Sequence, residues 1–317
     1  MSTPPLIMIV GPTAVGKSNL AIALAERVGG EIVAADSLQV YRGLDIGTAK
    51  ASAEEQRRVP HHLLDLVDPD MPFSAADYAR LARATIDDIR GRGRPPIVVG
   101  GTGLYARAFL HGLFDGPGED SVVRRALRQD AIRVGTPGLH QRLQGLDPEA
   151  AAGIHPNDLF RIVRALEVTT VAGRPISALR KESRRHHEPI RGPVLRFGLQ
   201  RPREELYRRI ETRVEEMMAR GFLDEVRGLL TRGYSPTLKP LRAIGYRHVI
   251  EHLEGRATLD EAVARLKRDT RRYAKRQLTW FHHEDGIQWC RMEGSDGISQ
   301  GLNSLAERIE GVWAGVM

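Results

Sequence analysis

The stretch that decides the fold is LIMIVGPTAVGKS, residues 6–18. Five apolar residues ended by a glycine predict a buried parallel strand, and the Ala/Leu-rich residues 19–27 predict a helix that ends at Gly29. The loop between them satisfies G-x-x-x-x-G-K-[ST], in which backbone N–H groups, the lysine and the helix N-terminus together bind phosphate. We therefore predict a phosphate or pyrophosphate site in this loop, with Ser18 as a Mg²⁺ ligand. The site residues are Gly11, Pro12, Thr13, Ala14, Val15, Gly16, Lys17 and Ser18.

Further strand patterns follow at 31–36, 96–99 and 194–199, and the first two alternate with helical stretches, including 74–90. Such alternation indicates right-handed crossovers and a parallel sheet. Residues from about 115 to 191 have helical patterns and no convincing strand, and further helices are expected at 202–220, 223–232 and 259–283. We expect an α/β fold with a P-loop NTPase-like parallel sheet core, residues 1–117 plus 193–317, and an inserted all-helical domain, residues 118–192.

Composition narrows the function classes. The 317 residues carry a formal charge of +7, which favours a polyanionic partner. The single cysteine, Cys290, excludes a disulfide framework or a Cys-rich zinc module and suits a reducing compartment. The N-terminus lacks the features of a signal peptide, and no apolar run approaches the roughly 20 residues of a membrane span. We expect a cytoplasmic protein without membrane contact.

The partner elements of a nucleotide hydrolase are poorly represented. The strand at 96–99 ends in a second glycine turn, Gly100-Gly101-Thr102-Gly103, where a Walker-B carboxylate is expected. Asp36 ends the strand pattern at 31–36, on the sheet edge where α/β proteins place their chemistry. A carboxylate there can act as a general base, although a turn or N-cap role remains an alternative. Residues 36–50 have no helix or strand periodicity and are typical of a binding loop.

A basic segment lies at 265–276. It contains one acid, Asp269, and seven cations, which are Arg265, Lys267, Arg268, Arg271, Arg272, Lys275 and Arg276. This pattern favours nucleic-acid binding, and the alternative is a solvated helix face. Three histidine pairs, at 61–62, 186–187 and 282–283, do not favour a zinc site, because adjacent side chains point apart and no thiols accompany them.

Six blocks of the sequence resemble the tRNA dimethylallyltransferase family, the isopentenyltransferases that prenylate the adenosine on the 3′ side of the anticodon. They are GPTAVGKS at 11–18, DSLQVYRGLDIGTAK at 36–50, VVGGTGLYARAFLHG at 98–112, HPNDLFRIVRALEV at 155–168, RAIGYR at 242–247 and KRQLTWF at 275–281. The resemblance implies that the phosphate loop holds the pyrophosphate of dimethylallyl diphosphate together with Mg²⁺, which accounts for the missing Walker-B carboxylate.

The same resemblance implies roles for individual residues. Asp36 would take a proton from the adenine exocyclic amine, Thr102 would lie beside the reacting centre, and Arg213 would bind pyrophosphate, with Arg209 as the alternative. The partner would be the anticodon stem-loop of tRNA, bound by a monomer. The expected tRNA contacts are Asp36, Ser37, Leu38, Gln39, Thr102, Phe160, Arg161, Arg164, Arg242, Gly245, Tyr246, Arg247, Lys275, Arg276, Gln277 and Trp280.

Three other functions stay open at this stage. A small-molecule P-loop kinase would transfer phosphate from ATP, an adenylate isopentenyltransferase would prenylate a free nucleotide, and a non-enzymatic RNA-binding protein would use the loop only for structure. The inserted helical region and the basic segment favour tRNA over a free nucleotide.

Overall fold

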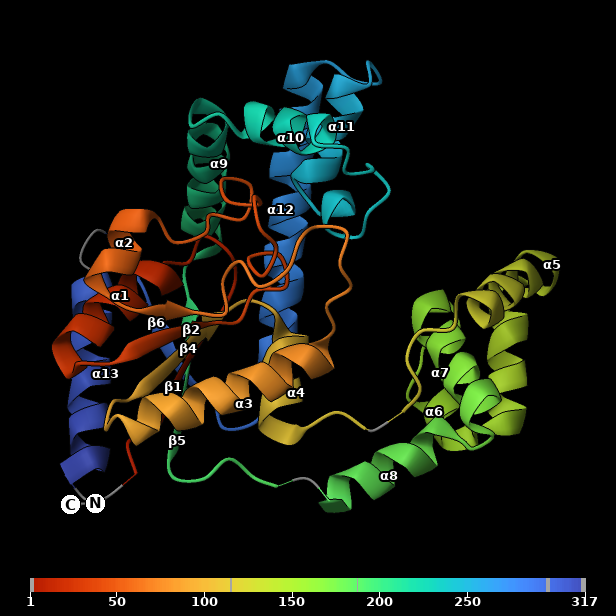
Figure 1. The fold of residues 1–317 in the computed structure, drawn as a ribbon, viewed down its shortest axis with the longest axis horizontal. Helices are drawn as coiled ribbons and strands as arrows, with labels where there is room; N and C mark the ends of the chain where they lie inside the picture. Colours follow the sequence, from red (N-terminus) through yellow and green to blue (C-terminus); the bar gives the residue numbers. More distant parts are fainter. Residues whose placement is uncertain (1–2, 115, 187, 295–296, 315–317) are drawn as a thin grey trace. The chain divides into compact units, whose positions relative to one another are not determined.

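The computed structural model describes residues 3–114, 116–186, 188–294 and 297–314 (Figure 1). Its centre is a six-stranded parallel sheet in the order β3-β2-β4-β1-β5-β6. The strands are β1 (Leu6–Val10), β2 (Glu31–Ala34), β3 (His61–His62), β4 (Pro96–Gly100), β5 (Val194–Gln200) and β6 (Gln288–Arg291). The α/β class and the parallel sheet are confirmed.

This strand order positions the site. β4 lies between β1 and β2, so the carboxyl ends of these three strands are neighbours in the sheet. The phosphate loop follows β1, Asp36 follows β2 and Thr102 follows β4. Three segments that are far apart in the sequence therefore meet at one sheet edge, which is where parallel α/β sheets bind ligands.

Helices cover the sheet and extend beyond it. Ile7 and Ile9 of β1 pack in one apolar core with Phe197 of β5 and with side chains of α1 and α13. The helix α12 packs against α9 and α11 (Figure 1). The helices of this part are α1 (Lys17–Val28), α2 (Ala53–Arg58), α3 (Ala75–Gly91), α4 (Gly103–His111), α9 (Arg203–Ala219), α10 (Phe222–Thr231), the 3₁₀ helix η1 (Pro240–Arg242), α11 (Tyr246–Leu253), α12 (Leu259–His282) and α13 (Gly297–Ala314).

Contacts divide the chain into two compact units, residues 1–109 with 190–317 and residues 110–189. The second unit is all-helical in its described residues and has its own apolar core, built around Leu127, Leu143, Ile162 and Leu166. Its helices are α5 (Ser121–Leu146), α6 (Pro148–Ala152), α7 (Leu159–Ala172) and α8 (Ile176–His186). The boundaries expected from sequence, residues 118 and 192, lie further along the chain than those of this unit. The division of the chain into a catalytic core and an inserted domain stays a prediction.

Several elements differ from expectation. The strand expected at 31–36 ends at Ala34, so Asp36 lies in the following loop rather than in the strand. The sequence patterns do not indicate β3, β6, α2, α4, η1, α11 or α13. β3 has only two residues, and β6 is an edge strand with partly exposed side chains, so neither has an apolar pattern that sequence alone reveals. The helix expected at 74–90 is present as α3, and Ser74 caps it: its side chain accepts the Asp77 N–H in a capping box.

Candidate active site

The phosphate loop has a backbone that requires glycine. Gly11 has φ +142°, and a Cβ on it would lie 2.6 Å from the Leu199 carbonyl oxygen. Gly16 has φ +110°. Ala14 has φ +63°, which is uncommon for a residue with a Cβ and marks local backbone strain. The loop therefore adopts a shape that the surrounding structure imposes.

Three side chains brace this loop from outside. The Nε of Arg201 donates to the Val15 carbonyl and the Nε of Arg209 donates to the Ala14 carbonyl, both at 2.9 Å. The Thr13 N–H donates to Oε1 of Gln277, also at 2.9 Å. Because two of its carbonyls and one of its N–H groups are bound by these side chains, the protein itself holds the loop in shape, as a preorganised anion site requires.

Lys17 lies inside this loop. Its Nζ donates to the carbonyls of Gly11 at 3.0 Å and Pro12 at 2.7 Å. Burial and the nearby Arg213 guanidinium lower the pKa of Lys17 to about 7, against an opposing effect of Asp36. An anion bound here would stabilise the protonated form of Lys17, because it would offset both the burial and the neighbouring positive charge.

The segments that carry Asp36 and Thr102 meet at the strand ends. The Leu38 N–H donates to Oδ1 of Asp36 at 2.9 Å, and the Ser37 N–H donates to Oγ1 of Thr102 at 3.2 Å. The first bond closes a local turn, which is the alternative role considered for Asp36. The bond from Leu38 engages only one carboxylate oxygen of Asp36, so the second oxygen can still accept a proton as a base.

Arg213 is the arginine beside the lysine. Burial lowers its pKa, and the Asp36 carboxylate opposes that shift. Its Nη2 lies 3.5 Å from the Thr48 carbonyl, at the limit of a hydrogen bond. Arg209 instead donates to the phosphate loop itself. The two candidates for a pyrophosphate ligand therefore occupy different positions, and Arg213 is the one whose charge acts on both Lys17 and Asp36.

The loop 36–50 is fixed by buried polar contacts. The Gln39 amide donates to the carbonyls of Thr48 and Ala49 at 3.2 and 3.3 Å. The buried Lys50 ammonium donates to Asp45 at 2.6 Å and to Asp65 at 2.5 Å. The Lys50 ammonium thus links this loop to the segment that contains Asp65. No sequence pattern distinguishes Lys50, although it ends the matched block at 36–50.

Glu225 on α10 is a second residue of this site that no sequence pattern indicates. Its carboxylate accepts the backbone N–H groups of three successive loop residues, Asp45, Ile46 and Gly47, at 2.6 to 3.1 Å. It also accepts the hydroxyl of the fully buried Tyr246 at 2.7 Å. No sequence signal distinguishes this glutamate, because it is one acid among several on an amphipathic helix.

The RAIGYR segment is divided between the surface and the interior. Gly245 has φ +97° and is buried, as is Tyr246, whereas Arg242 and Arg247 are exposed. Arg247 pairs with Asp269 at 2.6 Å. Tyr246 and Gly245 offer little or no side-chain surface in this structure.

The basic segment lies on α12, and neighbouring acids compensate much of its charge. Arg265 pairs with Glu251, Lys267 with Glu215 and Arg271 with Glu211. Arg268 and Arg272 both lie within ion-pair distance of Asp269. Lys275 and Arg276 are exposed and form no ion pair with the described residues. These two cations are therefore the part of α12 that is most available to an external anion.

Two further predicted contacts on α12 point inward. Gln277 is buried and bonds the phosphate loop. The Trp280 ring lies under the Arg107 guanidinium at 4.5 Å, and its buried Nε1 has no hydrogen-bond partner among the described residues. A Cβ on Gly103 would overlap this indole, so Trp280 packs against the start of α4.

The predicted contacts in the all-helical unit lie on α7. Phe160 is 72% exposed, and Arg161 is exposed beside Asp158. Arg164 instead binds the carbonyls of Pro117 and Gly118 and pairs with the buried Glu167. Because Arg164 is engaged within the unit, Phe160 and Arg161 are the more accessible of the three.

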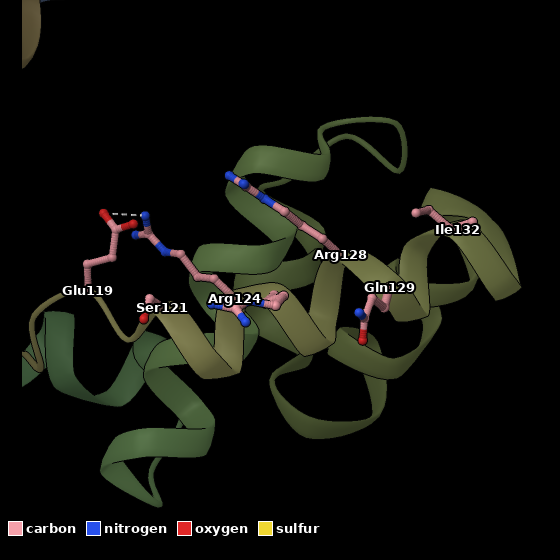
Figure 2. Close-up of a pocket in the computed structure, with 7 residues that line it drawn as sticks. Glu119, Ser121, Arg124, Arg128, Gln129 and Ile132 are labelled. Carbon is pink, nitrogen blue, oxygen red and sulfur yellow. Dashed lines mark ion pairs between the residues drawn. The ribbon is translucent and has the colours of Figure 1, made fainter. Parts of the chain in front are cut away.

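The all-helical unit also carries a cationic hollow of about 280 Å³ at α5. Figure 2 shows the Arg124 side chain paired with Glu119 at its edge, and the Arg128 side chain extending from the same helix. The lining residues are Glu119, Ser121, Arg124, Arg125, Arg128, Gln129 and Ile132.

No metal cage was found in the part of the chain that the structure describes, where no three His, Cys, Asp or Glu side chains are grouped to hold an ion. His62 contacts Glu31 and His282 stacks on Trp289, whereas His187 lies outside the described residues. Among the described helices, none combines the length and apolarity needed to cross a membrane.

Comparisons with known proteins agree on one family. The family model described as IPP transferase matches residues 39–284, and a second, described as isopentenyl transferase, matches residues 4–66. The tRNA dimethylallyltransferase of Geobacter metallireducens is 54% identical over 91% of this chain and 93% of its own length. That of Geobacillus thermodenitrificans is 46% identical over 98% of this chain and 97% of its own.

Solved structures give the same result. The full-length tRNA isopentenylpyrophosphate transferase of Bacillus halodurans aligns with a TM-score of 0.70 at 41% identity, covering 98% of both chains. A eukaryotic dimethylallyltransferase described as acting on tRNA aligns with a TM-score of 0.78 at 27% identity, covering 98% of this chain and 80% of that one. The predicted P-loop NTPase-like core and the predicted family are confirmed. The chain belongs to the tRNA dimethylallyltransferase (IPP transferase) family, a family of prenyl-transferring enzymes.

Proposed function

We propose that this chain transfers the dimethylallyl group of dimethylallyl diphosphate to N6 of the adenosine on the 3′ side of the tRNA anticodon, releasing pyrophosphate. One observation carries the assignment of roles: a candidate base, Asp36, lies close enough to the cations Lys17 and Arg213 to influence the pKa of both. Base and anion site thus share one sheet edge, as displacement of pyrophosphate by an amine requires.

The leaving group develops negative charge as the allylic C–O bond breaks. Backbone N–H groups of the phosphate loop, Lys17 and Arg213 would stabilise that charge, because they are already held in place before the reaction. Arg209 would act indirectly, by bracing the loop carbonyl of Ala14.

Mg²⁺ fits this site as a partner of the diphosphate. Ser18 presents an exposed hydroxyl on the first turn of α1, and Mg²⁺ commonly takes one or two protein oxygens with the rest from substrate phosphates and water. The ion would then neutralise diphosphate charge, with Ser18 as its protein ligand.

The nucleophile is the exocyclic amine, which Asp36 would deprotonate as the new C–N bond forms. The adenine must leave its stack in the anticodon loop to reach this position. Ser37, Leu38, Gln39 and Thr102 would surround the flipped base, since they flank Asp36 at the strand ends.

We assign the remaining tRNA contacts according to exposure. Lys275, Arg276, Arg242, Arg247, Phe160 and Arg161 would contact RNA directly. Gly245, Tyr246, Gln277, Trp280 and Arg164 would support these surfaces, because their side chains are buried or engaged within the protein. The enzyme would act as a monomer in the cytoplasm, which light scattering and cell fractionation would test.

The deciding experiment supplies dimethylallyl diphosphate labelled in its prenyl carbons together with a tRNA anticodon stem-loop, with AMP, or with both. Label in the stem-loop alone supports the proposal, and label in AMP supports an adenylate isopentenyltransferase. A parallel incubation with γ-labelled ATP tests the kinase alternative, which predicts phosphate transfer without prenyl transfer.

A further inference from the structure

We propose that Gln277 is a positioning residue that fixes the spacing between the phosphate loop and the second glycine turn. This inference rests on the proposed function, because those two segments hold the leaving group and the residue beside the reacting centre. It assigns Gln277 a role inside the protein, distinct from the RNA contact expected from its position in the sequence.

One amide side chain joins the two segments. Oε1 of Gln277 accepts the Thr13 N–H, and Nε2 of Gln277 donates to the Gly101 carbonyl, both at 2.9 Å. The partners also fix the orientation of the amide, since a backbone N–H can only donate and a carbonyl oxygen can only accept. The side chain is 6% exposed, so these bonds form largely away from water.

The second glycine turn is built around this contact. A Cβ on Gly101 would overlap Nε2 of Gln277, and a Cβ on Gly100 would overlap the Ala35 carbonyl. The turn is therefore in close contact with α12 through Gly101 and with the end of β2 through Gly100. Thr102 follows directly, so the position of its hydroxyl depends on the position of Gly101.

The same helix carries the exposed cations. Lys275 and Arg276 directly precede Gln277 on α12 and are the cations assigned to RNA. One turn earlier, burial raises the pKa of Tyr273, and the side chains of Gln277 and Thr102 oppose that shift. One stretch of α12 thus presents a surface for RNA while its buried face sets the distance between the two loops.

The experiment compares Gln277→Glu with Gln277→Met. The glutamate keeps an acceptor for Thr13 but places a second oxygen against the Gly101 carbonyl, whereas methionine keeps the length of the side chain and removes both bonds. The matched control is Gln56→Glu, because the exposed Gln56 amide also donates to a backbone carbonyl, that of Ala51, outside the site.

We expect Gln277→Glu to lower the single-turnover transfer rate about 10²-fold, the scale of loss for a misplacement of about 1 Å. Its dissociation constant for dimethylallyl diphosphate and for the stem-loop should stay near that of the native protein. Gln277→Met should lower the rate and also weaken diphosphate binding, because the phosphate loop then loses the acceptor of Thr13. Gln56→Glu should match the native protein in all three measurements.

A merely structural role would not lower the transfer rate of Gln277→Glu while its dissociation constants for dimethylallyl diphosphate and for the stem-loop stay near the native values. Thermal unfolding shows whether each variant folds, and Gln277→Met decides if Gln277→Glu does not fold. A native rate in the folded variants would overturn the proposal, as would loss of stem-loop affinity alone with an unchanged rate at saturating RNA. If the native protein and Gln56→Glu transfer no prenyl group to the stem-loop, the proposed function fails instead.

Discussion

The Tyr246 hydroxyl donates to the Glu225 carboxylate at 2.7 Å, and that carboxylate also accepts three successive N–H groups of the loop at residues 45–47. Tyr246 of the RAIGYR segment is therefore linked to the loop at residues 36–50 through Glu225, which lies outside both segments. Gly47 fits this arrangement because a Cβ there would lie 2.6 Å from the Tyr246 ring and would overlap Phe222.

Two variants test this anchor. Glu225→Ala leaves loop N–H groups without their acceptor, so we expect a loss of about 1–3 kcal/mol in the free energy of unfolding. Tyr246→Phe removes one hydrogen bond and should cost only about 0.5–1.5 kcal/mol. Urea unfolding measures both, and a larger loss for Tyr246→Phe than for Glu225→Ala would contradict the central position of the glutamate.

Asp36→Ala tests the assigned base. General-base catalysis contributes about 10²–10⁴-fold, so the transfer rate should fall by that factor. Binding of dimethylallyl diphosphate should persist, because the phosphate loop and its braces are unchanged. Single-turnover kinetics and equilibrium dialysis separate the two effects. A near-native rate would remove Asp36 from the chemistry.

The pKa of Lys17 predicts how diphosphate binding depends on pH. The anion favours the protonated ammonium, whose pKa is about 7 in the free protein and should rise once diphosphate is bound. Below pH 7 the lysine is already protonated, so it adds no pH dependence. As pH rises from 7 to 9, affinity should fall, by up to about tenfold per pH unit, with uptake of a proton on binding.

Calorimetry in buffers of different ionisation enthalpy measures that proton uptake. Lys17→Met should bind diphosphate more weakly and show no proton uptake attributable to this position. A native affinity that stays constant between pH 7 and 9 would contradict the depressed pKa as a feature of the anion site.

The exposed end of α12 predicts a selective salt effect. Lys275→Ala and Arg276→Ala should each reduce the slope of log affinity for tRNA against log salt by about 0.7–0.9 if each removes one phosphate contact. Arg271→Ala is the matched control, because Arg271 pairs with Glu211 at 2.6 Å. Filter binding between about 50 and 200 mM salt measures the slopes. Equal slopes for all three variants would show that exposure does not decide which cations meet RNA.

Local pattern was enough to predict the framework of the site. The apolar run at 6–10, the glycines at 11 and 16 and the strand at 96–99 act through neighbours in sequence, so they indicate a strand, a turn and a parallel crossover without knowledge of distant residues. The strand expected from sequence extends too far, to Asp36, because the buried Ala35 continues the apolar pattern after the pairing of β2 with β4 has ended at Ala34.

The supporting residues could not be predicted in the same way. Glu225 and Arg201 lie about 180 residues from the backbone groups that they bind, and Lys50 pairs with Asp65 only because two loops fold together. The basic segment has a single acid of its own, Asp269, and the acids that neutralise Arg265, Lys267 and Arg271 come from other helices.

The sequence by itself determined that a phosphate loop follows a buried strand, that Asp36 and Thr102 follow two more strands, and that cations gather near residue 270. Only the tertiary structure decided which of these side chains are exposed and which are engaged within the protein. The physical reason is that periodicity and turn chemistry are local, whereas burial, ion pairing and the depressed pKa of Lys17 depend on groups that only the completed fold brings close.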